Sequence, residues 1–207
     1  IEAIVTFLAC SREGFACNPS LHRTYTCAEI GQLLNRLSAR ALITEPGWGA
    51  DRATADFDAV LAEVPTLKVV YTPDDFPEPA PNKTPPVPDP DKVTYLAFTS
   101  GTTGNPKGVG LCHDNLAHLC AWYRRYYGVT EADSVAAYAS FGFDACLMDM
   151  YPALTAGALI HIIPQNMRLD VDRMNDYFNE HGVTLAFMTT QLGRQFAEGM
   201  VNHSLRH

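Results

Sequence analysis

The chain has 207 residues, of which 47% are apolar and 18% are charged, which is the composition of an ordinary soluble globular protein. Its net charge of −8 argues against nucleic acid as a main partner, because nucleic-acid binding requires a basic face. No apolar run approaches the roughly 20 residues that span a bilayer, and the first residues lack a signal-peptide leader, so we expect a cytoplasmic protein without membrane contact. The chain does not begin with Met, which suggests that the natural N-terminus lies upstream.

Helices and short strands alternate along the first part of the chain. Apolar residues at helical spacing predict a first helix that Gly14 ends, and Thr26 with Glu29 forms the capping box of a second. The other elements predicted here are a helix at 57–64 and short strands at 15–19, 41–44 and 67–71. This alternation predicts an α/β fold with mainly parallel sheets flanked by helices.

Residues 73–90 contain eight of the chain's 14 prolines. Proline lacks a backbone N–H and is excluded from helix interiors and central strands, so we expect an extended surface connector here. It could be a domain boundary or a loop inside one domain. Because the same alternation of helices and strands continues on both sides, we favour the loop.

A strand at 92–98 is predicted to run into a glycine-rich stretch, and 109–112 is predicted to be the returning strand. Asp114 is expected to cap the next helix, and Pro152 to kink the one after it. The remaining predicted elements are helices at 114–127, 144–156, 171–178 and 190–200, and strands at 134–140, 158–164 and 183–188.

The stretch FTSGTTGNPKGVG, residues 98–110, holds four glycines, four hydroxyl side chains and one lysine. Backbone N–H groups, hydroxyls and the Lys107 ammonium in a turn after a strand suit phosphate oxygens. A Walker loop is excluded, because Pro106 stands at its second glycine and Gly108 at its magnesium-binding Ser/Thr. A Rossmann fingerprint is excluded as well, since its initial G-x-G is missing.

This stretch closely resembles the signature of the adenylate-forming superfamily, which includes acyl-CoA synthetases, nonribosomal peptide synthetase adenylation domains and luciferase-like ligases. The resemblance covers essentially all 207 residues. It implies that ATP, with Mg²⁺, activates a carboxylate to an acyl-AMP, releasing pyrophosphate, and that the acyl group then passes to a thiol. By direct match, Lys107 and Thr103 are the expected catalytic residues. The expected ATP-binding residues are Thr99, Ser100, Gly101, Thr102, Thr103, Gly104 and Lys107.

Asp144, in the segment GFDAC, points to the carboxylate that is activated. In amino-acid-activating members of the superfamily, the matching aspartate pairs with the substrate's α-ammonium group. The alternative is that Asp144 is only the N-cap of its helix. The same matching implies that Ala145, Met148 and Phe187 line an apolar side-chain pocket, which favours a neutral amino acid.

The chain resembles acyl- or aryl-CoA ligases up to about residue 110 and peptide-synthetase adenylation domains beyond it. Nothing in it resembles the family's later aromatic-Gly-Pro-Thr-Glu segment or its small C-terminal domain with a catalytic lysine. The resemblance therefore predicts that residues 1–207 are a partial N-terminal adenylation core, inactive alone. An acyl- or aryl-CoA ligase and a non-catalytic scaffold stay open as alternative functions. The identity of the acceptor thiol also stays open, between a carrier-protein phosphopantetheine and CoA.

The six cysteines include no Cys-x-x-Cys pair, so zinc and thioredoxin-like sites are not expected. We expect buried free thiols in a reducing compartment. His113 and His118 each lie near a cysteine, but no further ligand completes a metal-binding spacing, so no metal site is predicted. His113 is expected to have a structural role.

Overall fold

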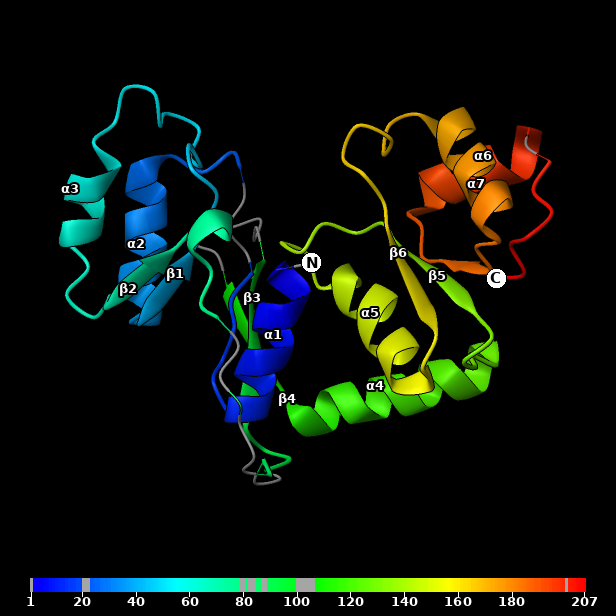
Figure 1. Cartoon of the computed structure of the whole chain (residues 1–207), viewed down its shortest axis with the longest axis horizontal. Coiled ribbons are helices and arrows are strands. Elements are labelled where there is room, and N and C mark those ends of the chain that lie inside the picture. Colours follow the sequence, from blue (N-terminus) through cyan, green and yellow to red (C-terminus); the bar gives the residue numbers. More distant parts are fainter. Residues whose placement is uncertain are drawn as a thin grey trace. The chain divides into compact units, whose positions relative to one another are not determined.

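A computed structural model describes residues 2–19, 23–78, 81, 85–86, 89–99, 107–199 and 201–207 (Figure 1). They form two compact units, Ile1–Thr6 with Leu21–Val87 and Phe7–Ser20 with Pro88–His207, and one of the three boundaries between them falls within the proline-rich stretch. Within the described part of the chain, no helix is both long enough and apolar enough to cross a bilayer.

The first unit contains two short parallel strands and two helices, β1 (Ala41–Ile43), β2 (Val69–Tyr71), α2 (Cys27–Leu37) and α3 (Phe57–Ala62). The capping box predicted for α2 is present. Thr26 Oγ1 accepts a hydrogen bond from Glu29 N at 3.2 Å, and the Glu29 carboxylate accepts one from Thr26 N at 2.8 Å. The buried face of α2, Ile30 and Leu34, packs in one cluster with Phe57 of α3.

A parallel sheet in the order β6-β5-β7 forms the centre of the second unit. Its strands are β5 (Ser134–Ala137), β6 (Leu159–Ile162) and β7 (Leu185–Ala186). Four helices cover its two faces: α4 (His113–Tyr127) and α5 (Ala145–Ala156) on one, α6 (Val171–His181) and α7 (Thr190–Gly199) on the other (Figure 1). The unit has separate hydrophobic clusters, and neighbouring residues of β5 belong to two of them. Val135 packs in one cluster with Tyr123, and Ala136 packs in another with Phe178.

The second unit also contains an antiparallel hairpin of β3 (Val93–Thr99) and β4 (Lys107–Cys112). Tyr95 of β3 is fully buried and makes an edge contact with Phe7 of α1 (Glu2–Glu13), with ring centroids 5.4 Å apart. Phe7 makes a similar contact at 5.5 Å with Tyr151 of α5. These three rings join α1, the hairpin and α5 in one core. The structure contains parallel sheets with flanking helices, which confirms the predicted α/β fold class.

Two sequence-based expectations are wrong in detail. The predicted strand at 15–19 is a single bridge between Cys17 and Tyr95, because the chain turns at Gly14 and leaves Phe15 65% exposed. Asp114 lies inside the first turn of α4 and does not cap it. The cap position is Cys112, whose backbone N and thiol both donate to Asn115 Oδ1, at 3.0 and 3.2 Å.

Candidate functional site

The hairpin fixes the two ends of the predicted phosphate loop. Thr99, the last residue of β3, is paired in register with Lys107, the first residue of β4. The Lys107 side chain is exposed at this end. Gly108 lies across from Phe98, and a Cβ there would approach Phe98 Cε1 to 3.2 Å, so the small residue beside Lys107 leaves room for the ring. Five of the predicted loop residues lie outside the described part of the chain, namely Ser100, Gly101, Thr102, Thr103 and Gly104. The Thr99 side chain lies outside it as well.

Asp144 occupies the position just before α5 and is exposed. Its backbone already has helical angles, φ −60° and ψ −24°, and its side chain makes no capping hydrogen bond. A capping side chain accepts a hydrogen bond from the second or third backbone N–H of its helix. The Asp144 carboxylate therefore accepts no hydrogen bond from the first backbone N–H groups of α5, and the structure does not support the alternative that Asp144 is only an N-cap.

The charge of Asp144 acts on the buried side of the hairpin. Burial is the main cause of a raised pKa at Tyr95 in β3, and the neighbouring Cys146 and Asp144 add to it. Burial likewise raises the pKa of Cys146 to about 12, with contributions from Asp149 and Asp144. The start of α5 and the strand leading to the predicted phosphate loop therefore share one electrostatic environment.

Sequence reasoning missed Asp149, which lies on the buried side of α5 with only 1% of its surface exposed. Its Oδ2 accepts a hydrogen bond from Ala139 N at 2.8 Å, and its Oδ1 has no partner. Burial raises its pKa to about 7, and the backbone hydrogen bond from Ala139 N only partly offsets this. Asp149 thereby holds the backbone just after β5, where the chain leads to Asp144. The available signal was an acidic residue inside the apolar run CLMDMY.

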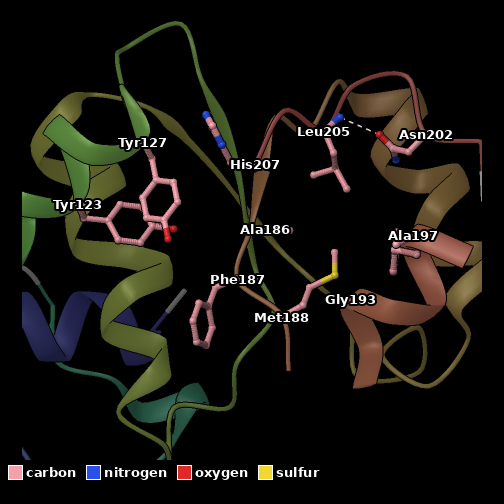
Figure 2. A pocket seen from close by; sticks show the side chains of 11 residues that line it. Tyr123, Tyr127, Ala186, Phe187, Met188, Gly193, Ala197, Asn202, Leu205 and His207 are labelled. Atoms are coloured by element: carbon pink, nitrogen blue, oxygen red, sulfur yellow. Dashed lines mark hydrogen bonds between the residues drawn. The ribbon is translucent and has the colours of Figure 1, made fainter. Parts of the chain in front are cut away.

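The predicted substrate-pocket residues do not all meet in one cavity. Phe187 lines a cleft of about 580 Å³ in the second unit, whereas Asp144, Ala145 and Met148 do not. Figure 2 shows Tyr123 and Tyr127 of α4 on one side of this cleft, and Leu205 and Ala197 on the other. Met148 is half-buried and packs against the cluster that contains Tyr123. Ala145 is also half-buried.

Metal-ligating side chains do not gather in the part of the chain that the structure describes: no group of three or more His, Cys, Asp or Glu could hold an ion there. His113 instead lies within hydrogen-bonding distance of Ser11 Oγ (2.9 Å) and of the Asp89 carbonyl (3.1 Å). It thus connects the start of α4 to α1. Three of the six free cysteines are buried, as expected for all, and three are half-buried.

Comparison with known sequences identifies a matching family and similar proteins. The family model described as AMP-binding enzyme matches residues 1–206. Surfactin synthase subunit 2 of Bacillus subtilis (strain 168) is 47% identical over 116 residues, which are 56% of this chain and 3% of that protein. The chain therefore spans a few per cent of the length of this curated relative.

Solved structures share the fold over most of the chain. ATP-bound MatB from Rhodopseudomonas palustris superimposes with a TM-score of 0.77 at 23% identity, covering 96% of this chain and 39% of that one. The nonribosomal peptide synthetase FmoA3, in its α-methyl-L-serine-AMP bound form, gives a TM-score of 0.67 at 26% identity. That match covers 85% of this chain and 19% of FmoA3.

Proposed function

This chain belongs to the AMP-binding enzyme family, and we propose that the protein containing it activates a carboxylate with ATP. A carboxylate oxygen attacks the α-phosphorus, an acyl-AMP forms, and pyrophosphate leaves. The barrier consists largely of charge on the transferring phosphates, which positioned N–H, hydroxyl and ammonium donors stabilise. The hairpin supports this role, because it fixes both ends of a loop rich in such donors and brings Lys107 to one of them. Mg²⁺ accompanies the nucleotide phosphates in this proposal, since the described residues supply no carboxylate cluster for it.

We infer that the carboxylate is that of an amino acid. The observation that carries this is the exposed Asp144 carboxylate without a capping bond at the start of α5. An α-ammonium group offers a carboxylate a charge-assisted hydrogen bond, which an acyl or aryl acid does not. The likeness to surfactin synthase and to FmoA3 supports the same choice. Ala145 and Met148, which follow Asp144 on α5, are apolar, which favours a neutral side chain. The proposed acceptor is a carrier-protein phosphopantetheine thiol, with CoA as the alternative.

An ATP–pyrophosphate exchange assay on the full-length protein tests this function across amino acids and across fatty and aryl acids. We expect exchange with one or a few neutral amino acids. Asp144→Asn should raise the KM for the amino acid by roughly 10- to 100-fold, the value of a hydrogen bond to a charged group, while leaving the KM for ATP unchanged. Asp176→Asn, an exposed aspartate of α6, is the matched control. Exchange only with acids that lack an amino group would instead favour the acyl- or aryl-CoA ligase, and no exchange with any acid would favour the scaffold.

Lys107→Gln separately tests whether the Lys107 ammonium stabilises the transferring phosphates of ATP. Loss of a cation that stabilises the transferring phosphates should lower kcat by about 100-fold, with little change in the KM for the amino acid. Lys68→Gln is the control, because Lys68 is an exposed lysine of the first unit. If Lys107→Gln lowered exchange no more than the Lys68 variant does, Lys107 would have no part in the reaction.

A further inference from the structure

Residues 138–144 connect the end of β5 to the start of α5, and Asp144 is the last of them. The connection contains a tight turn, in which Phe143 N donates to the Ser140 carbonyl at 2.9 Å. At its far end the Asp144 carbonyl accepts a helical hydrogen bond from Leu147 N, also at 2.9 Å. The place of the Asp144 carboxylate therefore depends on how this connection is held against α5.

Two side chains on the buried side of α5 hold the connection. Asp149 Oδ2 accepts a hydrogen bond from Ala139 N at 2.8 Å, and the Cys146 thiol lies 3.9 Å from the Phe141 carbonyl oxygen. Asp149 and Cys146 are 1% and 2% exposed, so water does not compete for these contacts. A thiol is a weak donor, whereas a carboxylate is a strong acceptor. Asp149 is therefore the main attachment of the connection to α5.

The Asp149 carboxylate is unfavourable for the stability of the fold. Its Oδ1 has no hydrogen-bond partner, and burial raises its pKa to about 7, so the folded chain loses stability as this group ionises. An apolar residue of similar shape would avoid that loss. What Asp149 supplies in return is the hydrogen bond to Ala139 N, near the start of the connection that carries Asp144.

We propose that Asp149 is a positioning residue for Asp144: by holding residues 138–144 against α5, it sets how well the Asp144 carboxylate receives the α-ammonium group of the amino acid. A recognition side chain needs such support, because its affinity depends on a fixed geometry. In this arrangement Asp149 touches no substrate and acts through the backbone that it binds. The inference rests on the proposed activation of an amino acid and deepens it.

The ionisation of Asp149 gives the proposal a pH-dependent consequence. The described groups that act on it electrostatically are Cys146 on its own helix, Tyr123 of α4 and Arg168 after β6. Burial raises the pKa of Cys146 and of Tyr123 to about 12, so both are neutral near pH 7, while Arg168 is charged. Between pH 6 and pH 8 the change of charge is therefore that of Asp149 itself.

Ionised Asp149 should strengthen the binding of an ammonium group at Asp144 in two ways. It is a stronger acceptor for Ala139 N than the neutral acid. It also adds a negative charge five residues along α5 from Asp144, which is about 7.5 Å of helix rise. The KM of the wild type for its amino acid should therefore fall by roughly two- to fivefold as the pH rises from 6 to 8.

A matched pair of variants separates the hydrogen bond from the shape of the side chain. Leucine and asparagine both resemble aspartate in shape, but only asparagine can accept from Ala139 N. In ATP–pyrophosphate exchange on the full-length protein, Asp149→Leu should raise the KM for the amino acid by roughly tenfold and leave the KM for ATP unchanged. Asp149→Asn should match the wild type at pH 6 and show no fall in KM up to pH 8. Asp176→Asn, on the exposed face of α6, should follow the wild type at each pH.

Amide hydrogen exchange without substrate measures the attachment itself. Asp149→Leu should speed exchange in residues 139–144 and leave α2 of the first unit unchanged, whereas Asp149→Asn should keep the protection of the wild type. Faster exchange in both units would indicate general destabilisation and would contradict a local positioning role.

The outcomes distinguish this inference from the proposed function. If the wild type activates amino acids but Asp149→Leu leaves their KM unchanged, or raises the KM for ATP equally, Asp149 does not position Asp144 and the proposed function stands. If the wild type activates no amino acid, the proposed function fails first and the inference fails with it.

Discussion

Asp149 is a buried carboxylate that receives one direct backbone hydrogen bond, at 2.8 Å from Ala139 N, and leaves its second oxygen unpaired. Its pKa is raised from 3.8 to about 7, mainly by burial. The unfolded chain therefore loses this proton at lower pH than the folded chain does. By linkage, the free energy of unfolding should fall as the pH rises from about 4 to about 7.

Asp149→Asn should remove this pH dependence, because the asparagine Oδ1 can still accept from Ala139 N and no charge is buried. At pH 8 we expect the variant to be more stable than the wild type, by at most about 4 kcal/mol, the equivalent of the full pKa difference. Urea unfolding at pH 4 and pH 8 measures this, with Asp176→Asn as an exposed control. A wild-type stability that does not fall between these two pH values would contradict the burial argument.

These residues differ in how far the sequence predicts them. Asp144 could be named in advance because it stands in a recognisable motif, and the structure adds that it makes no capping bond. The contribution of Asp149 depends on the backbone N–H of Ala139, ten positions away, reaching its carboxylate. The bridge of Cys17 to β3 depends in the same way on contacts with a distant segment. Such pairings follow from tertiary geometry, which composition and spacing do not encode.

At the scale of single elements, the capping box of α2 is a local device whose two hydrogen bonds join Thr26 and Glu29. Thr26→Ala removes the acceptor for Glu29 N and should destabilise α2 by about 1 kcal/mol. Amide hydrogen exchange in α2 should then become roughly fivefold faster, while exchange in α6 stays unchanged. Thr26→Ser keeps the hydroxyl and should restore protection. Equal exchange in the alanine and serine variants would show that the box contributes nothing.

The helices were the most predictable elements, and the reason is also local. Apolar spacing and capping residues lie within a few positions of each other, so α2 and α6 occur where the sequence places them. A strand needs a partner that the local sequence does not specify. Residues 15–19 have the apolar residues of a strand, but only Cys17 meets β3, so they form one bridge. The start of α4 was misplaced for a related reason: the cap came from Asn115, whose side chain reaches back to Cys112.

At the scale of the whole molecule, alternating helices and strands predict parallel pairing, which β1–β2 and β6-β5-β7 confirm. The order of strands within a sheet and the assignment of residues 7–20 to the second unit could not be predicted. Both depend on contacts between segments far apart in the sequence. The ion pair of Arg206 with Asp133 is such a contact, and it joins the last residues described to the start of β5.

Arg206 contacts the Asp133 carboxylate at 2.8 Å and also donates to the carbonyls of Tyr127 and Gly128 at the end of α4. Asp133 is buried, and Thr184 Oγ1 donates to it at 2.8 Å. Burial alone would raise the pKa of Asp133. The hydrogen bonds from Arg206, Thr130 and Thr184 outweigh burial and lower it. A lowered pKa adds stability above the unfolded-state pKa, and this stability is lost as the pH falls through the folded-state pKa.

Arg206→Gln should therefore lower the free energy of unfolding at pH 7 by about 2–3 kcal/mol, because it leaves a buried carboxylate without its cation. This expected loss of unfolding free energy is smaller than that for a fully buried ion pair, since 38% of the Arg206 side chain is exposed. The gap between variant and wild type should narrow as the pH falls below about 4 toward the lowered pKa of Asp133 in the folded wild type, because protonation removes the charge that Arg206 stabilises. Urea unfolding at pH 7 and pH 3 measures the gap, with Arg173→Gln on the exposed face of α6 as control. A gap that stays constant between these pH values would mean that Arg206 stabilises the fold through the α4 carbonyls and not through Asp133.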